Sequence, residues 1–598
     1  MLQRRMLPAT VLCLVSAWSH PSVATPSFQL HSEKTEWRQT GRYAEVEELC
    51  QQLPKQYPKL VRCFEFGRTP EGRPQLALTV GQAGFLEAKV NHEKKRPIVA
   101  FQGGIHAGEV DGKDAGFLFV RDVLVGKVLP GVLEKLTLLF VPVFNVDGHE
   151  RFAPNNRPNQ NGPEETGWRT TAQNFNLNRD YLKAEAPEMQ AMLRLLDAWD
   201  PIVYMDLHVT DGAQFQHDIA VMIDPATAGP EALQKPAAAL RDRVMSDLEK
   251  AGHLPLWFYP SFEKMDDPTS GIRHGPSTPR FSNGYWASSN RIGILVETHS
   301  WRPFSQRVKS TYNTLRSVTG AAAAEGQAWL KAAEAADRQF ANRVGQEVIL
   351  SYKNTDKVTN FDFQGYAYTR DLSDVSGQLM TRYDPKTPQV WKMPLRAEVI
   401  PHVVLQVPKG GYIVPPAYQK LLREKFRLHG IQFTELTTAQ TLVASVYRMR
   451  DTKLSSQSFE KRQRAEYQGE WQEKTETFPT GSLFVPANQS RILLAMQLLE
   501  PASADSLLSW GFFNEVFERK EYMEPYVAEE VARKMLDNPT VRKEFTEKLK
   551  DPAFAKDPQQ RLDFFYQRHP SFDQAWNRYP ILKTDENPLT KKQLSQGL

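Results

Sequence analysis

The sequence has 598 residues, and its 74 basic and 70 acidic side chains give a formal net charge of +4. With 41% hydrophobic and 24% charged residues, the composition is that of a globular protein and excludes a disordered or collagen-like chain. No basic cluster marks a surface for nucleic acid or for an anionic membrane, so neither is expected as a partner. The length allows roughly two to four domains.

Residues 1–24 combine a short basic start, an apolar stretch of about 13 residues and then Ser22-Val23-Ala24. This order is typical of a secretory signal peptide that is cleaved after Ala24. The apolar stretch is shorter than the about 20 residues that a membrane-spanning helix needs. We therefore expect an exported protein, periplasmic or secreted, with no membrane insertion after the signal is removed.

The cysteines also bear on whether the protein is exported. Cys13 would leave with the signal peptide, which makes Cys50 and Cys63 the remaining pair. In an oxidising compartment two cysteines this close in sequence favour a disulfide. A reduced and buried pair is the alternative.

From residue 25 to residue 338, apolar strands alternate with amphipathic helices. The buried strands are expected in segments such as RPIVAFQGG, KLTLLFVPVFN, PIVYMDLH and RIGILVETHS. Continuous apolar strands between helices predict an α/β sheet that is covered by helices on both faces. An alanine-rich helix over roughly 308–338 is expected to close this domain.

The pattern changes at about residue 339. Short strands separated by turn residues predict a β-rich α+β accessory domain over 339–480, and helical patterns predict a mainly helical region over 481–598. Asn538 and Pro539 are suited to cap and to begin one of these helices. No motif in this C-terminal region is tied to chemistry.

Candidate metal ligands lie at the ends of three predicted strands. His106 and Glu109 follow the first, His208 ends the second and Glu297 ends the third. Ligands bind at the carboxyl ends of strands in open α/β sheets. Two imidazoles and one carboxylate, with water in the fourth position, form a catalytic zinc site. Any one of these residues alone is more often a hydrogen-bonded polar group, but three strand ends together favour a metal.

Here the chain resembles the zinc carboxypeptidases related to pancreatic carboxypeptidase A. The resemblance runs from about Tyr43 to Thr319, and its landmarks, in family order, are EGRP, GGIHAGE, PVFNVDG, GWRTTAQNFNLNRDY, MDLH and LVETHS. It implies a carboxypeptidase-like fold with a mixed, mostly parallel sheet. It also implies that His106, Glu109 and His208 bind one Zn²⁺ ion.

The resemblance further implies roles for five other residues. Glu297 would act as general base and then as general acid, and Arg169 would polarise the scissile carbonyl. Asn178 and Arg179 would bind the terminal carboxylate of the substrate, and Tyr285 would cap the substrate. Each role suits its side chain, because a guanidinium keeps its charge beside an oxyanion and binds a carboxylate through two hydrogen bonds.

Some positions depart from the family pattern. Asn176 stands where the family usually has an Asp that holds the first histidine ligand; its amide oxygen can still accept the bond, but the ligand becomes less basic. Gly108 stands where pancreatic members have an Arg. Tyr285 lies closer to Glu297 in sequence than the pancreatic pattern suggests, and Tyr259 is the other candidate for the capping tyrosine.

Alternatives remain open for several residues. Arg179 could instead pair with Asp180, and His217 could compete with His208 as a ligand. Arg273 or Arg280 could select acidic side chains, although a surface role is the simpler interpretation for both.

The leading hypothesis is an exported zinc-dependent carboxypeptidase. It would hydrolyse the C-terminal peptide bond of a peptide with a free terminal carboxylate, through a zinc-activated water and Glu297. The alternatives are a zinc amidohydrolase that acts on cell-wall peptides or N-acyl amino acids, and a non-catalytic peptide-binding module. The pair Asn178 and Arg179 separates the first two, because it requires a free carboxylate next to the scissile bond.

Overall fold

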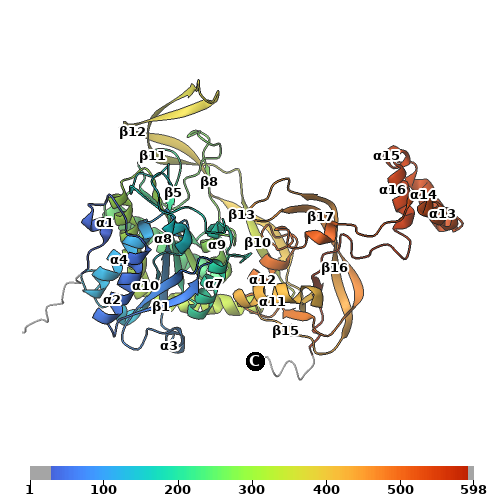
Figure 1. Cartoon of the computed structure of the whole chain (residues 1–598), viewed down its shortest axis with the longest axis horizontal. Helices are drawn as coiled ribbons and strands as arrows, with labels where there is room; N and C mark the ends of the chain where they lie inside the picture. Colours follow the sequence, from blue (N-terminus) through green and yellow to red (C-terminus); the bar gives the residue numbers. More distant parts are fainter. Residues whose placement is uncertain (1–27, 590–598) are drawn as a thin grey trace, which may run out of the picture.

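The computed structural model describes residues 28–589 of the chain. The signal peptide expected at 1–24 lies outside the described residues. Within that range, no helix is both long enough and apolar enough to cross a membrane. Figure 1 shows an N-terminal α/β half packed beside a C-terminal half, from which a small group of helices projects.

Eight strands of the N-terminal half form one mixed sheet in the order β1-β2-β4-β3-β5-β9-β6-β7. The four central strands, β4, β3, β5 and β9, run parallel to one another, which confirms a mixed sheet with a parallel centre. The bounds are β1 Val61–Arg68, β2 Pro74–Val80, β3 Ile98–Gly103, β4 Thr137–Val141, β5 Val203–Thr210, β6 Ile219–Asp224, β7 Pro255–Leu256 and β9 Ile292–His299.

Helices cover both faces of this sheet, as the sequence predicts. Successive strand residues point to opposite faces, so Val99 and Phe101 join one apolar cluster while Ile98 and Ala100 join the other. The first face is covered by α2 Tyr43–Gln56, α4 Asp111–Leu124, α8 Glu231–Lys250 and α10 Phe304–Ala341; the second is covered by α7 Pro187–Trp199 and α9 Ser282–Ser288.

The closing helix α10 is longer than the predicted 308–338, because it begins directly after Pro303 and ends at Ala341. Short helical turns complete the N-terminal half: α1 His31–Lys34, α3 Ala88–Glu93, α5 Val132–Lys135, α6 Val146–Glu150 and the 3₁₀ turn η1 Leu177–Arg179.

The C-terminal half contains two small sheets and one larger sheet. Strands β10 Glu347–Asn354 and β13 Val399–Gln406 form a pair, and the long hairpin β11 Thr359–Leu372 and β12 Leu379–Arg396 pairs with β8 Ile272–Arg273 of the N-terminal half. The six-stranded sheet has the order β15-β18-β14-β19-β16-β17. Its bounds are β14 Gly411–Val414, β15 Thr434–Glu435, β16 Gln440–Leu454, β17 Ala465–Phe478, β18 Leu483–Pro486 and β19 Leu582–Thr584.

The expected boundary at residue 480 does not separate two units. Strands β18 and β19 lie in the 481–598 region, yet both pair with β14 inside the six-stranded sheet. Helices α11 Gln419–Leu428 and α12 Ile492–Leu499 pack into the same apolar cluster as α7 and α9. The prediction failed because local periodicity does not report which distant strands pair.

A helical group lies in the 481–598 region. It consists of α13 Pro525–Met535, α14 Pro539–Lys548, α15 Pro552–Lys556 and α16 Pro558–Tyr566, and it has its own core around Phe545 and Phe565. The Asn538 side chain accepts a hydrogen bond from Thr540 N at 2.9 Å, and Pro539 is the first helical residue. This confirms the predicted cap. The short turns η2 Pro416–Tyr418 and η3 Asn514–Phe517 complete the C-terminal half.

The expected disulfide is present. Cys50 of α2 is bonded to Cys63 of β1, with a Cα–Cα distance of 5.4 Å and a sequence separation of 13. The bond ties the first long helix to the edge strand of the eight-stranded sheet.

Replacing both Cys50 and Cys63 by Ser should lower the free energy of unfolding by about 3 kcal/mol, because the unfolded chain regains the freedom of a short closed loop. Urea unfolding of the oxidised protein and of the double variant measures the difference. Reduced wild-type protein is the control and should match the double variant; equal stability of all three would contradict the prediction.

Candidate metal centre and substrate site

The three predicted strand ends meet because β3, β5 and β9 are neighbours in the sheet. His106 and Glu109 lie in the tight turn between β3 and α4, where Glu109 N donates to His106 O at 2.9 Å. His208 of β5 lies directly opposite Glu297 of β9 in the strand register. All four side chains are at most 6% exposed.

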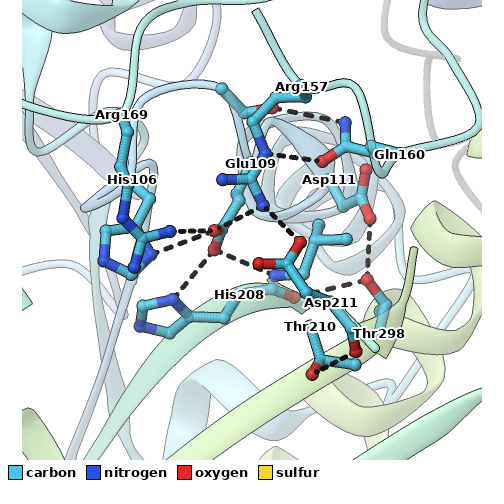
Figure 2. Close-up of polar contacts among 12 residues, drawn as sticks. His106, Glu109, Asp111, Arg157, Gln160, Arg169, His208, Thr210, Asp211 and Thr298 are labelled. Atoms are coloured by element: carbon cyan, nitrogen blue, oxygen red, sulfur yellow. Dashed lines mark hydrogen bonds and ion pairs between the residues drawn. The ribbon is translucent and has the colours of Figure 1, made fainter. Parts of the chain in front are cut away.

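The Glu109 carboxylate lies between the two histidines (Figure 2). Its Oε1 lies 3.0 Å from Nδ1 of His106, and its Oε2 lies 2.9 Å from Nδ1 of His208. Ligand atoms of the three residues lie within 4.8 Å of one another, so one ion could contact all three. The predicted convergence of His106, Glu109 and His208 is confirmed.

The second nitrogen of each histidine faces an oxygen that orients the ring. Asn176 Oδ1 lies 3.1 Å from Nε2 of His106, and Asp206 Oδ2 lies 2.9 Å from Nε2 of His208. Such partners hold a ligand histidine in one orientation and tune its basicity. The amide at position 176 therefore does accept the bond that the sequence suggested, while His208 has a carboxylate partner.

Burial and neighbouring charges set the protonation of the histidines. Burial lowers the pKa of His106 to about 4, so this ring is neutral and can donate an electron pair to a metal. Burial also acts to lower the pKa of His208, but the carboxylates of Asp206 and Glu297 outweigh it and hold that pKa well above its ordinary value. A bound cation would displace that proton, since a metal ligand must be deprotonated.

Glu297 lies next to the cluster as a carboxylate without a full set of partners. Its Oε2 is buried and has no hydrogen-bond partner among residues 28–589. Burial raises the pKa of Glu297 to about 8. Two imidazole nitrogens and one carboxylate are the donor set of a catalytic zinc site, so the residues present fit this ion.

Arg157, which lies in the same loop as Arg169, also contacts the site. Its Nη2 lies 2.9 Å from Glu109 Oε1 (Figure 2). A Cβ at Gly108 would lie 2.7 Å from Arg157 Cγ, so the absence of a side chain at Gly108 makes room for the stem of this arginine. Gly108, which departs from the pancreatic pattern, was therefore the feature of the sequence that could have indicated a large side chain packed against it, here that of Arg157.

Arg169 lies at the open side of the cluster. Its Nη1 is 3.6 Å from Glu109 Oε1, and its side chain is 38% exposed. The charge of Arg169 also acts on both His106 and Glu297, which marks it as a near neighbour of each. A guanidinium in this position can reach both the cluster and a bound substrate.

Asn178 and Arg179 follow Asn176 in the η1 turn. Asn178 N donates to Asn176 Oδ1 at 3.1 Å, and Asn178 Oδ1 is buried without a hydrogen-bond partner in the described range. The Arg179 guanidinium lies 4.6 Å from the Phe281 ring centroid, and no carboxylate in residues 28–589 forms an ion pair with it. Burial lowers the pKa of Arg179, with Arg169 adding to the effect.

The open alternative for Arg179 was a salt bridge with Asp180. Asp180 instead pairs with Lys183 and accepts hydrogen bonds from Glu185 N and Ala186 N at 2.9 and 2.8 Å. Its carboxylate is fully engaged, which leaves Arg179 available for a ligand.

Tyr285 does not reach the site, which corrects the sequence prediction. It belongs to α9, is 3% exposed, and its hydroxyl lies 3.0 Å from Nδ1 of His429 in the C-terminal half. Tyr259 fits better: its hydroxyl accepts a hydrogen bond from Thr210 at 3.0 Å, and the charges of Glu297 and Glu109 raise its pKa in addition to burial. Sequence distance alone favoured Tyr285. It cannot show which face of a helix packs into the core.

The remaining candidates have structural partners. His217 Nδ1 contacts Leu254 O at 3.1 Å and its Nε2 accepts from Gln364 N, so it is not part of the metal cluster. Arg273 pairs with Glu263 at 3.0 Å, and Arg280 pairs with the buried Asp505 at 2.6 Å. Arg273 also lies 3.6 Å from Asp356, so both arginines already have acidic partners within the described residues.

Comparison with known proteins finds one matching family model. Residues 46–221 match the family model described as zinc carboxypeptidase. This segment is thus similar to zinc carboxypeptidases, and the matched residues contain all three members of the cluster.

Individual relatives are distant. The chain is 21% identical to Carboxypeptidase 2 of Trichophyton equinum over 463 residues, which are 74% of this chain and 79% of that protein. It is 22% identical to Carboxypeptidase E of Caenorhabditis elegans over 231 residues, 37% of this chain and 43% of that protein. Among solved structures it is similar to carboxypeptidase A from Helicoverpa armigera, at 15% identity and a TM-score of 0.35, over 49% of this chain and 74% of the other.

Asn176→Asp should tighten zinc binding, because a carboxylate makes the His106 ring a more basic ligand. An increase of about tenfold in affinity is expected from the size of such partner effects. Competition with a fluorescent chelator measures the dissociation constant of the purified protein. Asn176→Ala is the matched control and should weaken binding; unchanged affinity in both variants would contradict the role of residue 176.

Proposed function

We propose that the chain is an exported carboxypeptidase that hydrolyses the C-terminal peptide bond of peptides with a free terminal carboxylate. One arrangement supports this most strongly. A possible metal-binding cluster lies beside a buried carboxylate, Glu297, and near Arg179, which forms no ion pair with a carboxylate of residues 28–589. The same side chains occur in the positions that the resemblance to the family assigns to catalysis and to carboxylate binding.

His106, Glu109 and His208 would hold the zinc ion. When bound, zinc acts as a Lewis acid and lowers the pKa of a water from 15.7 toward about 7. Glu297 Oε2, which has no hydrogen-bond partner in the described part of the chain, would take the proton of the attacking water and deliver it to the leaving amine. Arg169 would stabilise the negative charge that develops on the scissile carbonyl oxygen, since its own charge is permanent.

The free carboxylate of the substrate would bind Arg179 and Asn178. A guanidinium binds a carboxylate through two parallel hydrogen bonds, and the amide of Asn178 offers a further donor. This role is supported by Arg179, because no carboxylate in residues 28–589 forms an ion pair with its guanidinium. An amidohydrolase that cuts an internal amide bond of a cell-wall peptide has no comparable use for this guanidinium.

Export is part of the proposal. The apolar segment at residues 1–24 is the sequence basis for it, and the Cys50–Cys63 disulfide supports it, because such bonds persist in oxidising compartments.

Glu297→Gln should retain zinc and lose about a thousandfold in kcat, within the range of general acid–base effects. The amide keeps the shape of the side chain but cannot accept the proton. Stopped assays on a free-acid peptide, together with metal analysis of the same preparation, measure both quantities. A variant with near-normal turnover and a full complement of zinc would contradict the general-base role.

Arg179→Gln should lower kcat/KM for a free-acid peptide by about a hundredfold, because the substrate carboxylate loses its charged partner. The wild-type enzyme should leave the C-terminally amidated form of the same peptide intact. Mass spectrometry of the products, with and without a zinc chelator, measures this.

Arg194→Gln on the exposed side of α7 is the matched control and should cleave like the wild type. Cleavage of the amidated peptide, or cleavage within the chain, would contradict the carboxylate-binding role and favour the amidohydrolase.

A further inference from the structure

A turn of the C-terminal half lies beside the carboxylate-binding residues. It connects β16 to β17 and consists of residues 459–462, in which Phe459 and Arg462 exchange backbone hydrogen bonds of 2.8 and 3.0 Å. Glu460 and Lys461 at its tip have φ values of +50° and +70°, which residues other than glycine rarely adopt. This backbone is therefore held in place by its surroundings.

Contacts on either side of the tip hold the turn. Arg462 Nε lies 3.0 Å from both carboxylate oxygens of Glu185, and the Arg462 guanidinium lies 3.7 Å from the ring centroid of Phe512. Phe459 stacks on Trp510 with ring centroids 5.8 Å apart. Glu185 follows the η1 turn in the chain, so the tip is anchored directly to the segment that carries Asn178 and Arg179.

Glu460 points from this turn toward the η1 turn. Its Oε2 accepts a hydrogen bond from Asn176 N at 3.3 Å, two residues before Asn178. Burial and Arg169 lower the pKa of Arg179, and Glu460 is the first carboxylate that opposes them. No basic side chain within residues 28–589 forms an ion pair with Glu460.

Two other basic side chains near Arg179 or Glu460, those of Arg280 and Lys461, contact other groups. Arg280 is paired with Asp505, and the Lys461 ammonium lies 4.8 Å from the Phe175 ring centroid. Within residues 28–589, Glu460 is thus a carboxylate that forms no ion pair, and its charge acts on the guanidinium that would bind the substrate carboxylate.

We infer that Glu460 is a specificity-determining residue, supplied by the C-terminal half, which favours substrates with a basic C-terminal side chain. The inference rests on the proposed function. A C-terminal residue bound to Arg179 by its carboxylate projects its side chain from the adjacent Cα. A lysine or arginine side chain is long and cationic and can reach a nearby carboxylate, while an acidic side chain is repelled by it.

The test uses the full-length zinc enzyme and peptides that differ only in the last residue: Lys, Arg, Leu or Glu. The wild type should release Lys and Arg with a kcat/KM about tenfold above that for Leu, the size expected for one close charge pair. Glu460→Gln should remove this preference and leave release of Leu unchanged. Glu460→Lys should make Glu the preferred residue.

Lys461→Gln is the matched control, because it removes a charge from the same turn and should leave the preference unchanged. Thermal unfolding and zinc content of each variant establish that the fold and metal site are intact. Equal losses for all four peptides in Glu460→Gln would overturn the inference and make Glu460 a structural residue.

Other outcomes separate the inference from the proposed function. Efficient release of Leu without any preference for Lys or Arg would overturn the role of Glu460 and leave the carboxypeptidase proposal standing. No release from any free C-terminus would overturn both.

Discussion

Burial of the Glu109 carboxylate is the constraint on which the site depends. A carboxylate that is 2% exposed is stable only when its charge is matched and its oxygens are hydrogen-bonded. His106, His208, Val209 N and Arg157 all contact it, and they come from three separate segments of the chain. Satisfying this one group therefore brings together the end of β3, the strand β5 and the loop that contains Arg157.

That arrangement follows from the order of the strands. Because β3, β5 and β9 are parallel neighbours, their carboxyl ends open on the same edge of the sheet. Glu297 faces His208 across the β5–β9 pair and shares its buried environment. The scaffold thus holds a polar cluster at an edge where a substrate can enter, while apolar side chains fill both faces behind it.

The C-terminal half shares an apolar core with the N-terminal half. One apolar cluster includes Trp286 of α9, Leu422 of α11 and Leu494 of α12. The long β11–β12 hairpin extends a sheet through β8, and the turn at residues 459–462 contacts the η1 turn. A region without a recognisable motif therefore contributes both core packing and a contact with the η1 turn.

Much of this was predictable from the sequence, because it depends on local patterns and on landmarks that occur in order. The alternating strands and helices, the candidate metal ligands, the amide partner of His106, the Cys50–Cys63 bond and the Asn538 cap are all of this kind. Apolar periodicity and capping act over a few residues, so they can be read without knowing the fold.

Other features depended on the tertiary structure. Tyr285 packs in the core, Arg157 occupies the space beside Gly108, β18 and β19 join a sheet begun 70 residues or more before them, and Glu460 reaches Asn176 from the other half. Each is a contact between segments far apart in the chain. The packing of the whole core decides which of many such pairings forms. The sequence determines that packing, but local patterns in a single sequence do not reveal it.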